Sequence, residues 1–155
     1  MEKANIDQFD IQILRTISEN GRISVQELSQ IVGLSPSPVS RRLQLLEESN
    51  IITGYRALID EGSLGFKITV FVSVQLDKQV DVALDEFEKT ISELPEVVDC
   101  WLMTGNRDYL LRVVTGDLQD FEQFLTGNLT KIPGVSSIES SFPLRRVKSG
   151  ITRTP

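Results

Sequence analysis

The sequence predicts an α+β fold in two parts, because the spacing of its apolar residues first changes from a helical to a strand period near residue 65. Before this point apolar residues recur every three or four positions, which is the period of an amphipathic helix. Residues 66–77 instead alternate between apolar and polar side chains, which is the period of a strand, and helical and strand patterns then follow in turn. The glycine-containing stretch 61–65 marks the change, so we expect it to link a domain over 1–60 to a second domain over 66–155.

Two short helices are expected at the start of the chain. Asp7 can cap a helix over residues 7–20, with Gly21 as its stop. Ser24 and Glu27 have the spacing of a capping box, which predicts the beginning of a second helix. The inward stripes of the two helices are predicted to contain Ile11, Leu14, Ile17, Leu28, Ile31 and Val32.

A turn at Gly33 leads into a third helix with a polar outer face. Ser35 is placed to cap this helix, and Pro36 then occupies its first position, where a missing N–H costs nothing. The inward positions are Val39, Leu43 and Leu46, while another face gathers hydroxyl, guanidinium and amide groups without an acid. A solvated surface face is the alternative for this helix alone, but the succession of helix, glycine turn and polar-faced helix indicates a helix-turn-helix.

Hydroxyl, guanidinium and amide groups bind phosphate oxygens and base edges of DNA. We expect four side chains of the third helix to enter the major groove, those of Ser37, Ser40, Arg41 and Gln44. Two arginines, Arg42 and Arg56, are expected to contact phosphates. The helix is expected to end near Asn50 in a left-handed cap, and residues 51–60 to form a small hairpin, the wing of a winged helix. The expected DNA-binding residues are Ser35, Ser37, Pro38, Ser40, Arg41, Arg42, Gln44 and Arg56.

The second domain is expected to have the order β-α-β-β-α-β. The strands are predicted over 66–77, 97–103, 108–115 and 135–147, and the helices over 80–94 and 117–132, with a polar tail over 148–155. The inward helix positions are Val80, Leu84, Phe87, Ile91 and Leu94, then Leu118, Phe121, Leu125, Leu129 and Ile132. The predicted fold class is therefore α+β, an N-terminal winged helix-turn-helix followed by a ferredoxin-like βαββαβ sandwich domain.

One face of the predicted sheet is too apolar for free solvent. Thr69, Phe71, Ser73 and Trp101 lie on the side away from the two helices, which favours a subunit interface, although membership of an internal core is the alternative.

The composition argues against an enzyme, a metal site and a membrane protein. The chain has no histidine, which removes the commonest general base and metal ligand, and we expect no catalytic or metal-binding residues. Cys100 is the only cysteine and lies in a predicted strand, where a buried inert thiol is expected rather than a nucleophile. The absence of an apolar signal region and of a long apolar run favours a cytoplasmic protein. The net charge of −6 is unfavourable for DNA binding, so contacts are expected to add up in a dimer or larger assembly.

Several short stretches of the chain together form a recognisable pattern. They are residues 7–14, 20–22, 34–43, 46–47, 51–52, 54–55 with Ala57 and Asp60, and 105–109. With these stretches the chain resembles the Lrp/AsnC family of leucine-responsive and asparagine-responsive transcription regulators over nearly its whole length. The resemblance implies a prokaryotic transcription regulator with an N-terminal helix-turn-helix and a C-terminal domain that senses amino acids, dimerises and commonly assembles into octamers.

The resemblance also implies an effector site at the G-x-x-D loop over 105–108. Backbone N–H groups of such a loop can bind a carboxylate, and Asp108 can accept from an ammonium group, although the loop is also an ordinary turn. The implied site lies between dimers, with the last strand contributing, and an inward Arg107 would favour an acidic or polar effector. The expected effector-binding residues are Leu102, Met103, Thr104, Gly105, Asn106, Arg107, Asp108, Ser140 and Phe142.

The expected function is sequence-specific, double-stranded DNA binding that an amino acid modulates, with no other cofactor. The alternative is an architectural, chromatin-like protein that wraps DNA with little sequence choice.

Overall fold

The computed structural model describes residues 6–77, 81–148 and 153–154. Contacts within the chain divide it into two units, residues 59–147 and residues 1–58 with 148–155. Val80, expected on the inward stripe of a helix, lies outside the described residues.

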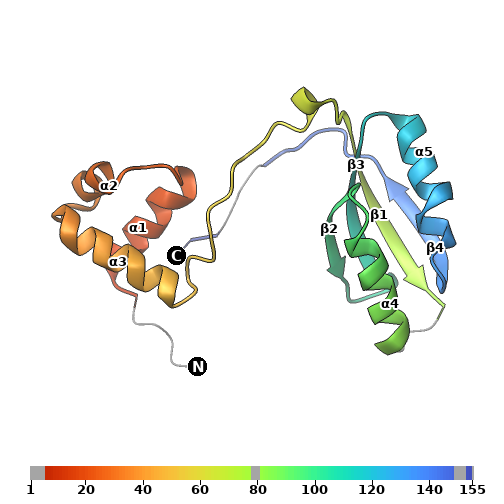
Figure 1. The fold of residues 1–155 in the computed structure, drawn as a ribbon, viewed down its shortest axis with the longest axis horizontal. Helices are drawn as coiled ribbons and strands as arrows, with labels where there is room; N and C mark the ends of the chain where they lie inside the picture. Colours follow the sequence, from red (N-terminus) through yellow and green to blue (C-terminus); the bar gives the residue numbers. More distant parts are fainter. Residues whose placement is uncertain (1–5, 78–80, 149–152, 155) are drawn as a thin grey trace. The chain divides into compact units, whose positions relative to one another are not determined.

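The first unit is a cluster of three helices, α1 (Gln8–Glu19), α2 (Val25–Val32) and α3 (Pro36–Glu48) (Figure 1). A small apolar core joins them, because each helix turns its apolar stripe toward the other two. The buried residues of this core are Ile13, Leu28, Val32, Val39 and Leu46.

The helix boundaries follow the predicted local chemistry closely. Asp7 accepts from the backbone N–H groups of Phe9 and Asp10, and Ser24 forms the expected capping box with Glu27. Gly33 has a φ of 75°, and Asn50, the predicted left-handed cap after α3, has a φ of 55°. The left-handed cap predicted at Asn50 is therefore confirmed, and the turn predicted at Gly33 has the same backbone conformation.

Two local predictions for this unit were wrong. Ser35 has the extended backbone of a cap, but its side chain makes no capping hydrogen bond. Pro38 stands at the third helical position and has no N–H, which removes one of the two donors that such a cap can use. Residues 51–60 contain no strand, so the expected wing hairpin does not form. An isolated two-stranded hairpin is barely stable without a third element to cover it.

The second unit is a four-stranded antiparallel sheet with two helices on one face (Figure 1). The strand order is β2-β3-β1-β4, which is that of the predicted βαββαβ sandwich. The strands are β1 (Ile68–Leu76), β2 (Val97–Leu102), β3 (Tyr109–Thr115) and β4 (Val135–Ser141), and the helices are α4 (Asp81–Ser92) and α5 (Leu118–Gly127). Two single 3-10 turns, η1 (Gly62–Leu64) and η2 (Leu129–Lys131), precede β1 and follow α5.

The alternating pattern predicted for the first strand is confirmed, because β1 buries every second residue against the helices. Val70, Val72 and Val74 are fully buried there, in contact with residues of both α4 and α5. Phe71 lies on the opposite face, and Trp101 is 44% exposed. These two aromatic residues therefore lie outside the internal core, and the alternative interpretation is wrong.

The ends of the second domain differ from prediction in two places. The last strand ends at Ser141 rather than at residue 147, because Pro143 cannot donate to the ladder and restricts Phe142 before it. The helix expected over 117–132 ends at Gly127 and continues only as the turn η2. Leu118, predicted to point inward, is exposed, and Phe124 is buried in its place.

Candidate functional sites

The polar face of α3 lies open to solvent. The residues predicted for the major groove, Ser37, Ser40, Arg41 and Gln44, are all exposed, as are Ser35, Pro38 and Arg56. The Gln44 amide donates to the Glu48 carboxylate one helical turn later, at 2.7 Å. Arg41 makes no ion pair within 4.0 Å in the part of the chain that the structure describes. This face offers hydroxyls and a guanidinium, as base edges and phosphates require.

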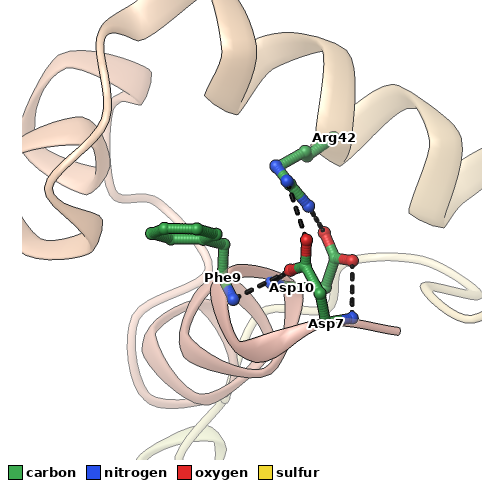
Figure 2. Close-up of polar contacts among 4 residues, drawn as sticks. All are labelled: Asp7, Phe9, Asp10 and Arg42. Atoms are coloured by element: carbon green, nitrogen blue, oxygen red, sulfur yellow. Dashed lines mark hydrogen bonds and ion pairs between the residues drawn. The ribbon is translucent and has the colours of Figure 1, made fainter. Parts of the chain in front are cut away.

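Arg42 behaves differently from its neighbour Arg41, as Figure 2 shows. Its guanidinium lies 2.8 Å from a carboxylate oxygen of Asp7 and 2.8 Å from one of Asp10, both at the beginning of α1. The same group stands 5.4 Å from the centre of the Phe9 ring, a cation–π distance. Two carboxylates thus neutralise Arg42, so the structure supports a role in holding α3 against α1 in place of the expected phosphate contact.

Asp7 and Asp10 also cap α1, and their contacts with Arg42 shift the pKa values of Asp7 and Arg42. Asp7 and Asp10 form a capping box that was not predicted from the sequence, in which each carboxylate accepts a hydrogen bond from the other residue's backbone N–H. The pKa of Asp7 is lowered, first by the hydrogen bond from the Asp10 backbone, against a smaller desolvation effect, and then by Arg42. The pKa of Arg42 is raised by its hydrogen bonds to the two carboxylates.

The G-x-x-D loop over 105–108 is a tight turn fixed to the central strand β1. Gly105 has a φ of 114°, a backbone conformation that side chains rarely permit. The backbone N–H of Asp108 donates to the carbonyl of Val74 at 2.9 Å, and the Asp108 carboxylate accepts from the N–H of Leu76 at 2.7 Å. Asp108 is only 5% exposed. Its carboxylate is therefore part of the fold, which weakens the expectation that it receives an effector's ammonium group.

Arg107 lies across the open face of the sheet. Its guanidinium donates to the Ser137 hydroxyl at 2.7 Å and to the Glu139 carboxylate at 2.9 Å, both on β4. Because Glu139 neutralises it, Arg107 gives no support to the selection of an acidic effector.

The remaining effector candidates form two separate groups. Leu102, Met103, Thr104, Gly105 and Asn106 are exposed around the loop. Phe142 packs edge-on against Phe121 of α5, with ring centres 5.6 Å apart. Phe142 follows Ser141, which pairs with Phe71 of β1. Asp108, at the end of the loop, contacts Leu76 of the same strand. Five residues of β1 separate these points, roughly 17 Å at the rise of a strand. One chain therefore does not bring Ser140 and Phe142 to the loop.

Sequence reasoning missed a second arginine that two carboxylates bind. Arg112 of β3 donates to Asp99 at 2.8 Å and to Glu61 at 3.1 Å. The available signal was a single charge between apolar residues in 109–114, on the strand position that faces away from the helices.

The second unit contains Cys100, the single cysteine of the chain. Cys100 is exposed on the edge strand β2, so the prediction that this residue is buried was wrong. Desolvation, together with the nearby charge of Glu88, nevertheless raises the pKa of its thiol to about 11, which makes it a poor nucleophile. Among the described residues no group of three or more acidic or cysteine side chains could hold a metal ion, and no helix is long and apolar enough to cross a membrane.

Comparison with known protein families matches both units. A model described as the Lrp/AsnC ligand binding domain matches residues 69–152, and one described as a winged helix-turn-helix DNA-binding domain matches residues 6–53.

Relatives match over almost the whole chain. The chain is 47% identical over 144 residues to the Bkd operon transcriptional regulator of Pseudomonas aeruginosa, covering 93% of this chain and 94% of that protein. It is 35% identical over 146 residues to the leucine-responsive regulatory protein of Rhizobium meliloti, covering 94% of each. The crystal structure of a Neisseria meningitidis transcriptional regulator in complex with L-methionine superposes with a TM-score of 0.90 at 36% identity, covering 94% of both chains.

Proposed function

This chain belongs to the Lrp/AsnC family of transcription regulators, and we propose that it recognises its operator through α3 and responds to an amino acid through the sheet domain. The family is one of DNA-binding regulators and not of enzymes, as the composition led us to expect. The observation that carries the proposal is the exposed face of α3, where the hydroxyls of Ser37 and Ser40 and the guanidinium of Arg41 lie open to solvent. We place the site of action on the chromosome, in the cytoplasm of a prokaryote.

In this proposal DNA binding uses two kinds of contact, to base edges and to phosphates. Arg41 can form two parallel hydrogen bonds with a guanine, while Ser37 and Ser40 bind base edges or phosphates. Arg56, exposed after the helices, contacts a phosphate. Arg42 stays with Asp7 and Asp10 and fixes the angle at which α3 presents this face.

We propose that the effector binds beside the loop over 104–106. Its carboxylate accepts from backbone N–H groups of the loop, and its side chain packs on Leu102 and Met103, which are exposed apolar residues. The L-methionine complex of the Neisseria meningitidis relative supports an amino acid with an apolar side chain.

A second copy of the chain completes this site. Ser140 and Phe142 lie far along the strand from the loop of their own chain, so a neighbouring copy must supply them if they contact the effector. The uncovered sheet face around Phe71 and Trp101 supports a homodimer, and further assembly, as far as an octamer, would bring loops and last strands of different dimers together.

A thermal-shift screen against the twenty amino acids tests the effector proposal. A ligand that binds only the folded state at a hundred times its Kd stabilises the protein by about 2.7 kcal/mol. Leu102→Ala is expected to reduce the shift produced by the best amino acid. Leu118→Ala is the matched control, because Leu118 is as exposed as Leu102, at 60% against 61%. Leu118 lies on the helix α5, away from the loop. A flat screen, or equal shifts in the two variants, would contradict the proposed position.

A further inference from the structure

The segment over 143–148 that follows the last strand carries a charge opposite to that of the rest of the chain. Residues 143–155 have four basic and no acidic side chains. Residues 59–142 have 6 basic and 15 acidic side chains, and residues 1–58 have 6 basic and 7 acidic ones. Residues 59–142 therefore have a net charge of −9, and residues 1–58, which carry α3 and are expected to bind a polyanion, have a net charge of −1. Of these three stretches, only residues 143–155 have a net positive charge.

The cations of this segment are available for binding, unlike several others in the molecule. Arg42, Arg107 and Arg112 each lie within 4.0 Å of at least one carboxylate. Arg145, Arg146 and Lys148 are exposed, and none of them makes an ion pair with any of the residues that the structure describes. An ordinary solvated surface would place acids beside them, as it does elsewhere in this acidic chain.

The backbone of the segment leaves it unpacked. Pro143 ends the pairing of β4, and no helix or strand forms between it and Lys148 (Figure 1). Leu144 is 101% exposed and Val147 is 82% exposed, so the apolar residues next to the cations do not anchor the segment to the sheet.

The end of the segment belongs to the DNA-binding unit. Lys148 groups by its contacts with the helix-turn-helix residues and not with the sheet. Arg145 and Arg146 precede it by three and two residues, which limits their distance from it to about 10 Å of extended chain. Arg145 and Arg146 are the last charged residues of the sheet unit, so all three cations lie within three residues of the boundary with the unit that carries α3.

We propose that Arg145, Arg146 and Lys148 contact the phosphate backbone of the DNA that α3 binds. They supply the sequence-independent attraction that α3 lacks, because Arg41 is the one basic residue of that helix without a carboxylate partner in the described chain. The competing partner is the acidic sheet domain of a second copy. DNA is favoured because the segment ends on the unit that binds DNA. The inference rests on DNA binding by the chain but not on the identity of any effector.

The test compares two triple variants of the full chain with the same change in charge. Arg145→Gln, Arg146→Gln and Lys148→Gln together remove the segment's cations. Lys67→Gln, Lys89→Gln and Lys131→Gln remove three exposed cations of the sheet domain and serve as the control. The affinity of each variant for a random-sequence DNA duplex is measured from roughly 50 to 200 mM salt, and its assembly state by sedimentation.

The segment variant is expected to lower the slope of log affinity against log salt by about 0.9 for each phosphate that it no longer neutralises, hence by about 2.7 per chain. The control variant is expected to keep the slope of the unaltered protein, and both are expected to keep its assembly state. Equal slopes in the two variants would overturn the inference, as would a change of assembly in the segment variant, which would assign the segment to contacts between copies. If the unaltered chain binds no duplex DNA at all, the proposed function fails together with the inference. If Arg41→Ala abolishes preference for an operator while the segment variant keeps the full slope, the inference fails alone.

Discussion

Arg42 Nη1 lies 2.8 Å from Oδ1 of Asp10, so a charge pair joins the helix with the exposed polar face to the first turn of the first helix. Asp10 is only 13% exposed in its side chain, and Asp7 binds the other guanidinium nitrogen. The pair therefore matters more than a typical surface ion pair.

Replacing Arg42 should destabilise the helix-turn-helix unit. Arg42→Ala leaves the mostly buried Asp10 carboxylate without its cation, and we expect a loss of about 1–2 kcal/mol in the free energy of unfolding, measured by denaturant titration. Arg22→Ala is the control, because Arg22 is exposed and makes no ion pair with the residues that the structure describes, and it should change stability by less than about 0.5 kcal/mol. Arg42→Ala could instead leave the stability unchanged and lower the slope of log DNA affinity against log salt. That result would show that Arg42 contacts a phosphate, as first expected from the sequence.

Arg41 and Arg56 should differ in what they contribute to DNA binding. Arg41→Ala is expected to reduce the preference for an operator, selected from random DNA, by roughly 1–3 kcal/mol, because its hydrogen bonds to base edges are removed. Arg56→Ala is expected to weaken binding to operator and random DNA alike and to lower the salt slope by about 1. If Arg41→Ala leaves the ratio of the two affinities unchanged, that side chain does not contact base edges.

Asp108 should behave as a structural residue. Asp108→Ala leaves the buried N–H of Leu76 without its acceptor, at a cost of about 1–3 kcal/mol in unfolding free energy. Asp108→Asn keeps an acceptor oxygen and should recover most of this loss. The same pair of variants separates the two roles considered for Asp108. A stable Asn variant that no longer shifts with the effector would restore the ammonium contact, and an Ala variant as stable as the unaltered protein would rule out the structural one.

The pH dependence of stability should carry the signature of Asp7. Its pKa in the folded protein is lowered from an ordinary value of 3.8, chiefly by the hydrogen bond from the Asp10 backbone. A lowered pKa means that the unfolded chain binds the proton more readily. The stabilisation is therefore present above about pH 4 and is lost as the pH falls through the lowered pKa. Asp7→Asn should flatten the acid side of the Tm profile, followed by circular dichroism. Glu19→Gln, an exposed change at the other end of α1, should leave the slope as it is.

The sequence was most informative where a local rule decides the structure. The capping box at Ser24, the left-handed backbone at Asn50 and the alternation along β1 all depend on neighbours within a few residues. The prediction of a capping hydrogen bond by Ser35 was wrong. Serine favours this position, but Pro38 removes one of the N–H groups that could donate to it.

The errors at the candidate sites arise from contacts between distant parts of the chain. Arg42 binds Asp10, and Asp108 binds Leu76, and in each pair the two residues are 32 positions apart in the sequence. Composition makes Arg42 a reasonable phosphate ligand and Asp108 a reasonable ammonium ligand, and nothing local shows that each already has a partner. The effector loop was located by resemblance, while its relation to Ser140 depends on register in the sheet.

The position of β1 in the middle of the sheet also determines the order in which the protein can be made. Its residue Phe71 pairs with Arg112 on one side and with Ser141 on the other, so the sheet is incomplete until 70 further residues have been synthesised. The helical unit depends on contacts between neighbouring segments, which form quickly. We expect residues 6–58 to fold on the ribosome as soon as they emerge, well before the sheet closes. During synthesis, the exposed face of α3 is therefore expected to form before the sheet and before the basic segment over 143–148 that follows it.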